Sequence, residues 1–130
     1  MKKSLFIGLF ITLIFPSVFA QSGTRFLENT PWVNVLQQAK QENKLIFVDC
    51  YTSWCGPCKQ LATEIFPQKI VGDFMNSKFV NVKYDMEKEE GLTFNQKYPD
   101  AIKAYPTMLI INTTGEIIHK IVAYRLILRW

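Results

Sequence analysis

The chain has 130 residues, of which 48% are hydrophobic and 20% charged, and its formal net charge is +4 at pH 7. A chain of this length suits a single domain with one buried core. The charge is mild and the basic residues are scattered, so the sequence does not predict a nucleic-acid-binding surface. We find no internal repeat, low-complexity tract or interdomain linker.

The first twenty residues have the pattern of an export signal. A short basic start, Met1-Lys2-Lys3, precedes an apolar run from Leu5 to Phe15, and small or permissive residues lead to Ala20. The pattern predicts a signal peptide over residues 1–20, cut near Ala20, and a domain over residues 21–130. An uncleaved anchor is the alternative, but the apolar run is shorter than the ~20 residues that span a bilayer. We therefore expect a secreted or periplasmic protein that meets the membrane only through this segment.

Helices and strands alternate along the rest of the chain. Thr30 is expected to cap a helix whose first residue is Pro31. The nearly continuous apolar run over residues 45–51 predicts a strand covered on both faces. Further elements follow in chain order: a helix to about residue 66, a helix over 70–76, a strand over 79–85, a helix over 91–98, and hairpin strands over 107–112 and 116–123. This alternation predicts an α/β protein with a central sheet flanked by helices.

The sequence Cys55-Gly56-Pro57-Cys58 comes directly after the apolar strand, where a helix is expected to begin. The unpaired N–H groups and the dipole of a helix favour an anion at its N-terminus, so Cys55 is expected to be a reactive thiolate. Cys58, one turn later, is placed to resolve the mixed disulfide that such a thiolate forms. Pro57 suits a first helical turn, and Gly56 would let a partner backbone approach the sulfur.

A structural zinc site is the alternative for these two cysteines. Such a site needs four ligands, and only Cys50 and His119 remain in the chain, neither at zinc-finger spacing. The sequence therefore favours thiol–disulfide exchange, with no metal site and no bound cofactor expected. Strand alternation predicts that Cys50 is buried and inert, and that His119 lies on the surface.

Several separate motifs resemble the thioredoxin family between about residues 30 and 123. They are Val48 to Lys59, which contains the two cysteines, Phe79 to Asp85, Ala104-Tyr105-Pro106-Thr107, and Thr113-Thr114-Gly115-Glu116. The resemblance implies a thioredoxin fold, a central mixed sheet flanked by helices, and disulfide exchange as the activity. It also implies protein disulfides as substrates and a membrane or soluble thiol as the electron donor.

Asp49 is the third candidate catalytic residue. Strand alternation places it on one face with Phe47 and Tyr51, where desolvation should raise its pKa. A strand-end carboxylate hydrogen-bonded to backbone is the simpler alternative. The resemblance implies that Asp49 lies beneath the cysteines and relays the proton of Cys58 as general base and acid.

The resemblance further implies a cis bond before Pro106, and pairing between the Tyr105 backbone and an extended substrate segment. Trp54 would pack beside the disulfide and shape the docking surface. The residues expected to bind substrate are Trp54, Gly56, Pro57, Tyr105 and Pro106.

Two features depart from the family pattern. Ala123 stands where thioredoxins usually carry a glycine, and only residues 124–130 follow, where the family continues with a long amphipathic helix. We therefore expect the C-terminal helix to be short or absent. The main expectation is a reductase of protein disulfides outside the cytoplasm. A truncated, non-catalytic thioredoxin-like binding module is the alternative, and a metal-binding chaperone is a distant third.

Overall fold

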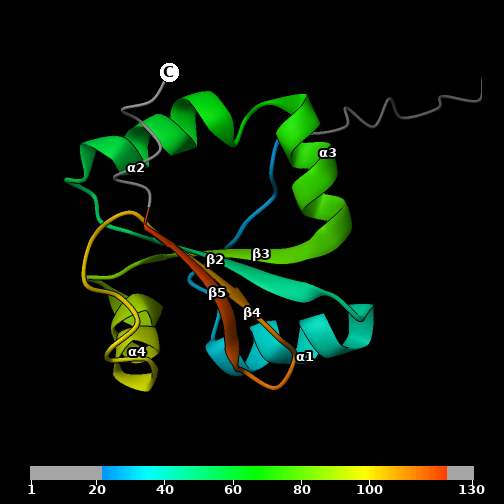
Figure 1. The fold of residues 1–130 in the computed structure, drawn as a ribbon, viewed down its shortest axis with the longest axis vertical. Helices are drawn as coiled ribbons and strands as arrows, with labels where there is room; N and C mark the ends of the chain where they lie inside the picture. Colours follow the sequence, from blue (N-terminus) through cyan, green and yellow to red (C-terminus); the bar gives the residue numbers. More distant parts are fainter. Residues whose placement is uncertain (1–21, 123–130) are drawn as a thin grey trace, which may run out of the picture.

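The computed structural model describes residues 22–122, which form a five-stranded sheet between two layers of helices (Figure 1). The strands are β1 (Leu27–Glu28), β2 (Leu45–Tyr51), β3 (Phe79–Asp85), β4 (Thr107–Ile111) and β5 (Ile117–Val122). The helices are α1 (Trp32–Glu42), α2 (Gly56–Gln60), the π-helical turn η1 (Leu61–Ile65), α3 (Lys69–Lys78) and α4 (Glu89–Lys97). The α/β architecture predicted from the sequence is confirmed.

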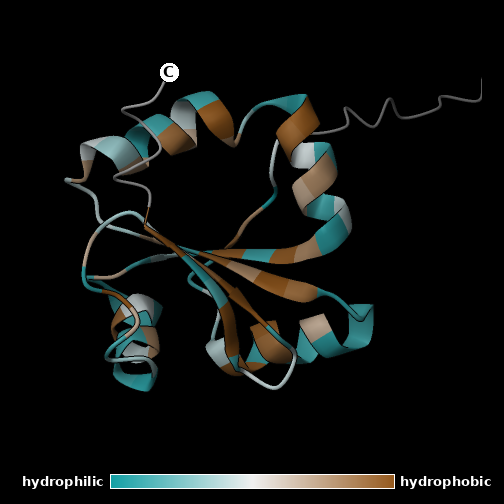
Figure 2. Cartoon of the chain, viewed as in Figure 1, coloured by the Kyte–Doolittle hydropathy of each residue, from teal (hydrophilic) through white to brown (hydrophobic). Residues whose placement is uncertain are grey.

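The sheet is mixed, with β2 at its centre and the strand order β1-β3-β2-β4-β5. β2 pairs in parallel with β3 and antiparallel with β4, while β1 extends the sheet beside β3 and β5 beside β4. Helices α1 and α4 cover one face, and the chain from α2 to α3 covers the other (Figure 1). The strands are mainly hydrophobic in Figure 2, as expected for a sheet that is covered on both faces.

Alternation along β2 sends successive side chains into two separate cores. Ile46, Val48 and Cys50 are fully buried in the core beneath α1 and α4. Phe47 points to the other face, where it packs with Phe66 and Met108. Asp49 shares the Phe47 face and is also buried, so the predicted division of β2 is confirmed.

Helices α3 and α4 begin one or two residues before the predicted positions, and two further features of the helices differ from the prediction. Thr30 does not cap α1: Pro31 occupies the capping position, and the Thr30 hydroxyl donates instead to the Glu28 carbonyl oxygen at 3.1 Å. The helix after the cysteines changes from α to π geometry over η1, where the Phe66 N–H donates to the Leu61 carbonyl oxygen at 2.9 Å. Local periodicity could not reveal this widened turn, which forms just before Pro67 interrupts the helix.

Residues 22–26, which we call the N-terminal strap, bind the second helical layer. The Thr24 N–H donates to the Phe66 carbonyl oxygen at 2.7 Å, and the Asn76 side-chain amide donates to the Gly23 carbonyl oxygen at 3.0 Å. Gly23 lies so close to Gly72 of α3 that a side chain at residue 72 would collide with the strap backbone. At the end of the strap, Phe26 packs on Phe66 with ring centroids 5.0 Å apart.

Three expectations fall on residues that the structure does not describe. The signal peptide over residues 1–20, the residue Ala123 and the short C-terminal segment over residues 124–130 all lie outside the described range. Between residues 22 and 122, no helix is long and apolar enough to cross a membrane.

Candidate active site

A disulfide joins Cys55 and Cys58 at the start of α2, with their Cα atoms 5.3 Å apart. Cys55 occupies the capping position, and its Sγ accepts a hydrogen bond from the Cys58 N–H at 3.2 Å. This N–H would also stabilise a thiolate on Cys55 after reduction. The bond between the two cysteines favours redox exchange over the zinc alternative. In the part of the chain that is described, no three His, Cys, Asp or Glu side chains gather as a possible metal site.

The two residues between the cysteines behave as the sequence predicts. Pro57 lies in the first turn of α2, where its missing N–H leaves no helical hydrogen bond unmade. Gly56 is exposed, and a Cβ built on it would meet nothing within 4 Å. The space beside Gly56 is therefore open to a partner chain, whereas both cysteines are buried.

Asp49 lies on β2 beneath this turn, and it lines a cavity of about 230 Å³ together with Cys58 and Lys83. The Asp49 side chain is 4% exposed, and its Oδ1 has no hydrogen-bond partner among the described residues. Burial raises its pKa to about 7, although the positive charge of Lys83 opposes the rise. The hydrogen-bonded strand-end alternative does not fit this unpaired oxygen. A carboxyl that titrates near neutrality beside Cys58 can accept and return a proton.

Trp54 forms one wall of the surface beside Cys55. Trp54 is 64% exposed, and its ring meets that of Tyr105 edge-on, with centroids 6.0 Å apart. Its indole N–H donates to both carboxylate oxygens of Glu87 at 3.1 Å. Trp54 is therefore an oriented surface residue, and its contact with Tyr105 places the loop before β4 next to the cysteine turn.

That loop carries the cis peptide bond between Tyr105 and Pro106 which the resemblance implied. Pro106 is buried, and the adjacent Thr107 hydroxyl donates to the Ala104 carbonyl oxygen at 2.7 Å, which closes the loop at the start of β4. Tyr105 remains partly exposed beside Trp54. The backbone of this loop is thus held at the edge of the candidate docking surface.

Cys50 and His119 lie where strand alternation placed them. Cys50 is fully buried and unpaired in the core on the face opposite Asp49, and burial raises the pKa of its thiol far above its ordinary value. The thiolate form of Cys50 is therefore not populated at neutral pH. His119 is exposed on β5.

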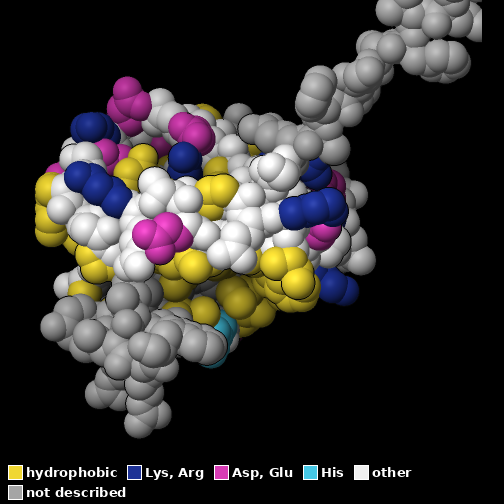
Figure 3. All heavy atoms as spheres, turned by 90° about the horizontal axis from the view of Figure 1, so that it is seen from above, with side chains coloured by type: hydrophobic (Ala, Val, Ile, Leu, Met, Phe, Trp, Pro, Cys, Tyr) yellow, Lys and Arg dark blue, Asp and Glu magenta, His cyan; other side chains and the backbone are white. Residues whose placement is uncertain are grey.

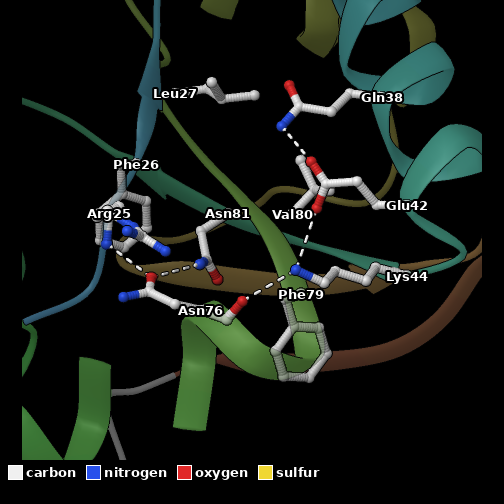
Figure 4. A pocket seen from close by; sticks show the side chains of 10 residues that line it. All are labelled: Arg25, Phe26, Leu27, Gln38, Glu42, Lys44, Asn76, Phe79, Val80 and Asn81. Carbon is white, nitrogen blue, oxygen red and sulfur yellow. Dashed lines mark hydrogen bonds and ion pairs between the residues drawn. The ribbon is translucent and has the colours of Figure 1, made fainter. Parts of the chain in front are cut away.

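A larger cavity, of about 300 Å³, lies near the N-terminal end of β2 and has no cysteine in its lining. Figure 4 shows that Asn76, Lys44, Glu42 and Gln38 cross it as a chain of polar contacts. The Lys44 ammonium is 3.0 Å from the Glu42 carboxylate and donates to the Asn76 carbonyl oxygen, also at 3.0 Å. These polar groups bind one another and help to fix the strap, so we assign the cavity a structural role.

Three residues around the cysteines were not singled out from the sequence. Glu87 is exposed, and its carboxylate accepts the hydrogen bond from the Trp54 indole. Lys83 lies in register with Asp49 on the neighbouring strand, and Glu28 pairs with Lys83 at 2.8 Å. A lysine between the apolar residues Val82 and Tyr84 was the available signal for Lys83. Nothing local marked Glu28, because β1 was not predicted.

Comparison with known proteins agrees with this geometry. The family model "Thioredoxin" matches residues 24–125. Thioredoxin H4 of Arabidopsis thaliana is 35% identical over 95 residues, which cover 72% of each chain. The solved structure of a candidate disulphide-isomerase from Bacteroides thetaiotaomicron is 46% identical, with a TM-score of 0.66, and the match covers 78% of this chain and 81% of that one.

Another relative shares only one segment with this chain. The peptide-N(4)-(N-acetyl-beta-glucosaminyl)asparagine amidase of Caenorhabditis briggsae is 25% identical over 93 residues, which cover 72% of this chain but 14% of that protein. The match does not extend to the rest of that longer protein. From the family model, the fold and the disulfide together, the chain belongs to the thioredoxin family and is a thioredoxin-like thiol–disulfide oxidoreductase with a redox-active Cys55–Cys58 pair.

Proposed function

We propose that this protein reduces disulfide bonds in other proteins outside the cytoplasm. The observation that carries the proposal is the Cys55–Cys58 disulfide at a helix start, above a buried carboxyl that shares a cavity with Cys58. Cys55 itself is 4% exposed, and the exposed Gly56 and Trp54 on either side of it would be the first residues of this turn to meet a protein chain. Thioredoxin-like proteins act on protein disulfides and exchange electrons with thiol donors, which fits this arrangement.

The first step is attack by the Cys55 thiolate on one sulfur of the substrate disulfide. A bond forms between Cys55 Sγ and that sulfur, while the substrate S–S bond breaks and the other substrate sulfur leaves as a thiolate that takes a proton from water. The Cys58 N–H, which lies 3.2 Å from Cys55 Sγ in the disulfide, stabilises the attacking charge. Extended substrate backbone would pair with Tyr105 beside Pro106 and align the two sulfurs.

The second step resolves the mixed disulfide. Asp49 accepts the proton of the Cys58 thiol, and the Cys58 thiolate attacks Cys55 Sγ. The Cys55–Cys58 bond forms as the second substrate sulfur leaves and is protonated, so the substrate is reduced by two electrons and the protein is oxidised. A pKa of about 7 suits Asp49 to this task, because the group is then partly ionised at neutral pH.

A dithiol donor, in a membrane or in solution, would return the protein to its reduced form by the reverse chemistry. The Gly56-Pro57 dipeptide resembles that of the reducing members of the family, which favours the reductase direction. The basic and apolar start of the sequence supports export, and in an oxidising compartment a reductase needs such a dedicated donor. The surface toward α2 and α3 supports a protein partner rather than nucleic acid, because its acidic and basic side chains are intermingled (Figure 3).

Substitution of each cysteine tests the order of attack. Cys55→Ser should abolish the reduction of insulin disulfides, because the attacking thiolate is lost. Cys58→Ser should leave the first step intact and accumulate mixed disulfides on Cys55, since no thiol remains to resolve them. Peptide mapping by mass spectrometry locates the trapped bond.

Cys50→Ser serves as the control, because Cys50 is buried on the opposite face and should not affect turnover. Adducts that map to Cys50, or a wild-type protein that binds substrates without reducing them, would contradict the proposed function. The second outcome would support the binding-module alternative.

The variant Asp49→Asn tests the buried carboxyl through stability. Between about pH 4 and pH 7, the folded protein holds a proton on Asp49 that the unfolded chain has lost, since the unfolded pKa is about 3.9. Wild-type stability should therefore fall as pH rises through this window and level off above it. An asparagine side chain cannot ionise, so the variant should gain on the wild type by a few kcal/mol at pH 8, at about 1.4 kcal/mol per pKa unit.

Urea unfolding at pH 4, 6 and 8 measures this difference. Stability curves of wild type and Asp49→Asn that run parallel across all three pH values would show that Asp49 is not held protonated by burial. The same variant should also resolve mixed disulfides more slowly, because Cys58 would lose its proton acceptor.

A further inference from the structure

Three charged residues form a row across the sheet toward the active site. Glu28 on β1 lies in register with Lys83 on β3, and Lys83 lies in register with Asp49 on β2. Neighbouring side chains in such a row project to the same face of a sheet. The row therefore leads from the exposed Glu28 at the sheet edge to the buried carboxyl beneath Cys58.

Lys83 is the middle residue of this row, and its ammonium is held toward Glu28 at the edge of the sheet. Its Nζ is 2.8 Å from Oε1 of Glu28 and 5.9 Å from the ring centroid of Phe26. Asp49, on its other side, has an Oδ1 with no hydrogen-bond partner among the described residues. Lys83 nevertheless lines the same cavity as Asp49 and Cys58, so its ammonium could reach toward the carboxyl if Glu28 released it.

We propose that Glu28 is a positioning residue that holds the Lys83 ammonium away from Asp49 and so keeps the carboxyl able to take the proton of Cys58. The inference rests on the proposed exchange mechanism and assigns to Glu28 a part in its second step. In that step, the proton moves from Cys58 to Asp49, the Cys58 thiolate attacks Cys55, and the substrate leaves as a thiol. A direct Lys83–Asp49 ion pair would favour the ionised carboxylate but weaken it as a base.

Other ionisable groups near Asp49 do not take the place of this pair. Tyr51 and Lys59 line the same cavity, and Cys50 follows Asp49 on β2 but is buried on the opposite face with a raised pKa. Asp85 forms its own pair with Lys88 at 3.3 Å, and on β4 the residue in register with Asp49 is the apolar Met108. Lys83 is the charged side chain that opposes the rise in the Asp49 pKa. The position of its ammonium therefore sets how far the Asp49 pKa is lowered.

The titration of Asp49 tests the proposal directly. The carboxyl carbon of Asp49 can be followed by 13C NMR against pH in the oxidised protein, where neither active-site cysteine titrates. In Glu28→Gln, Lys83 is released toward Asp49, and the midpoint of the titration should fall by about one unit. Glu28 is 67% exposed at its side chain, so this variant should keep the wild-type melting temperature.

Glu42→Gln is the matched control. It also removes one carboxylate from a lysine pair, but Lys44 lies five residues before Asp49, roughly 16 Å along an extended strand. This variant should leave the Asp49 midpoint unchanged. A Glu28→Gln midpoint equal to that of Glu42→Gln and of the wild type would overturn the proposal.

Lys83→Met separates positioning from the bare charge of Glu28. Alone, it should raise the Asp49 midpoint, because the only effect of Lys83 on Asp49 is to favour ionisation. When Glu28→Gln is added to Lys83→Met, the Asp49 midpoint should shift by less than a third of the shift that Glu28→Gln causes in the wild type. Equal shifts in both backgrounds would show that Glu28 acts through its own charge and would also overturn the proposal.

The same variants distinguish this inference from the reductase proposal. If Glu28→Gln shifts the Asp49 titration while the wild type fails to reduce insulin, the positioning role stands and the proposed reaction fails. If the wild type reduces insulin but the titration does not move, the reaction stands and Glu28 has no positioning role. When both stand, the pH profile for resolution of the mixed disulfide should shift with the Asp49 midpoint.

Discussion

The central strand β2 is buried on both faces, and this constraint organises the rest of the molecule. Its alternation places Ile46, Val48 and Cys50 in one core and Phe47 and Asp49 in the other. Where the strand ends, the chain turns directly into the helix that carries the disulfide. One strand thus fixes both the position of the cysteines and the carboxyl beneath them.

The position of Asp49 is costly for stability and useful for chemistry. A carboxyl with an unpaired, desolvated oxygen is held in its neutral form up to about pH 7. In the proposed mechanism, the same burial sets the pKa of Asp49 close to the pH at which a proton would pass between Asp49 and Cys58. Functional sites commonly retain groups that a stable core would exclude, and the proposed role of Asp49 gives this face of β2 such a reason to retain one.

Much of the fold could be predicted because its signals are local. The apolar run of β2, the strand over residues 79–85, which is β3, and the turn chemistry before β5 all depend on neighbouring residues. Local patterns failed where distant segments decide the outcome. The two-residue strand β1 exists because it pairs with β3. The missing cap at Thr30 is a local effect, since the Thr30 hydroxyl donates to the Glu28 carbonyl oxygen two residues earlier.

The residues of the active site likewise fall into those that local sequence patterns predict and those that they do not. Cys55 and Cys58 were evident from spacing and position, and the burial of Asp49 followed from strand alternation. The partners of these residues come from other parts of the chain: Glu87 binds Trp54, and Glu28 pairs with Lys83. Such pairs depend on the register of the assembled sheet and on loop packing, which a single sequence does not encode in a readable pattern.

The reactivity of the three thiols tests the central claim that Cys55 is an activated nucleophile at a helix start. The reduced protein would be alkylated with iodoacetamide at a series of pH values, and the rate at each cysteine followed by mass spectrometry. The account predicts that Cys55 reacts first, with a midpoint below ~7.5, while Cys58 lags and Cys50 stays unmodified in the folded protein. Equal rates at Cys55 and Cys58, with the midpoint near ~8.5 of an ordinary thiol, would contradict it.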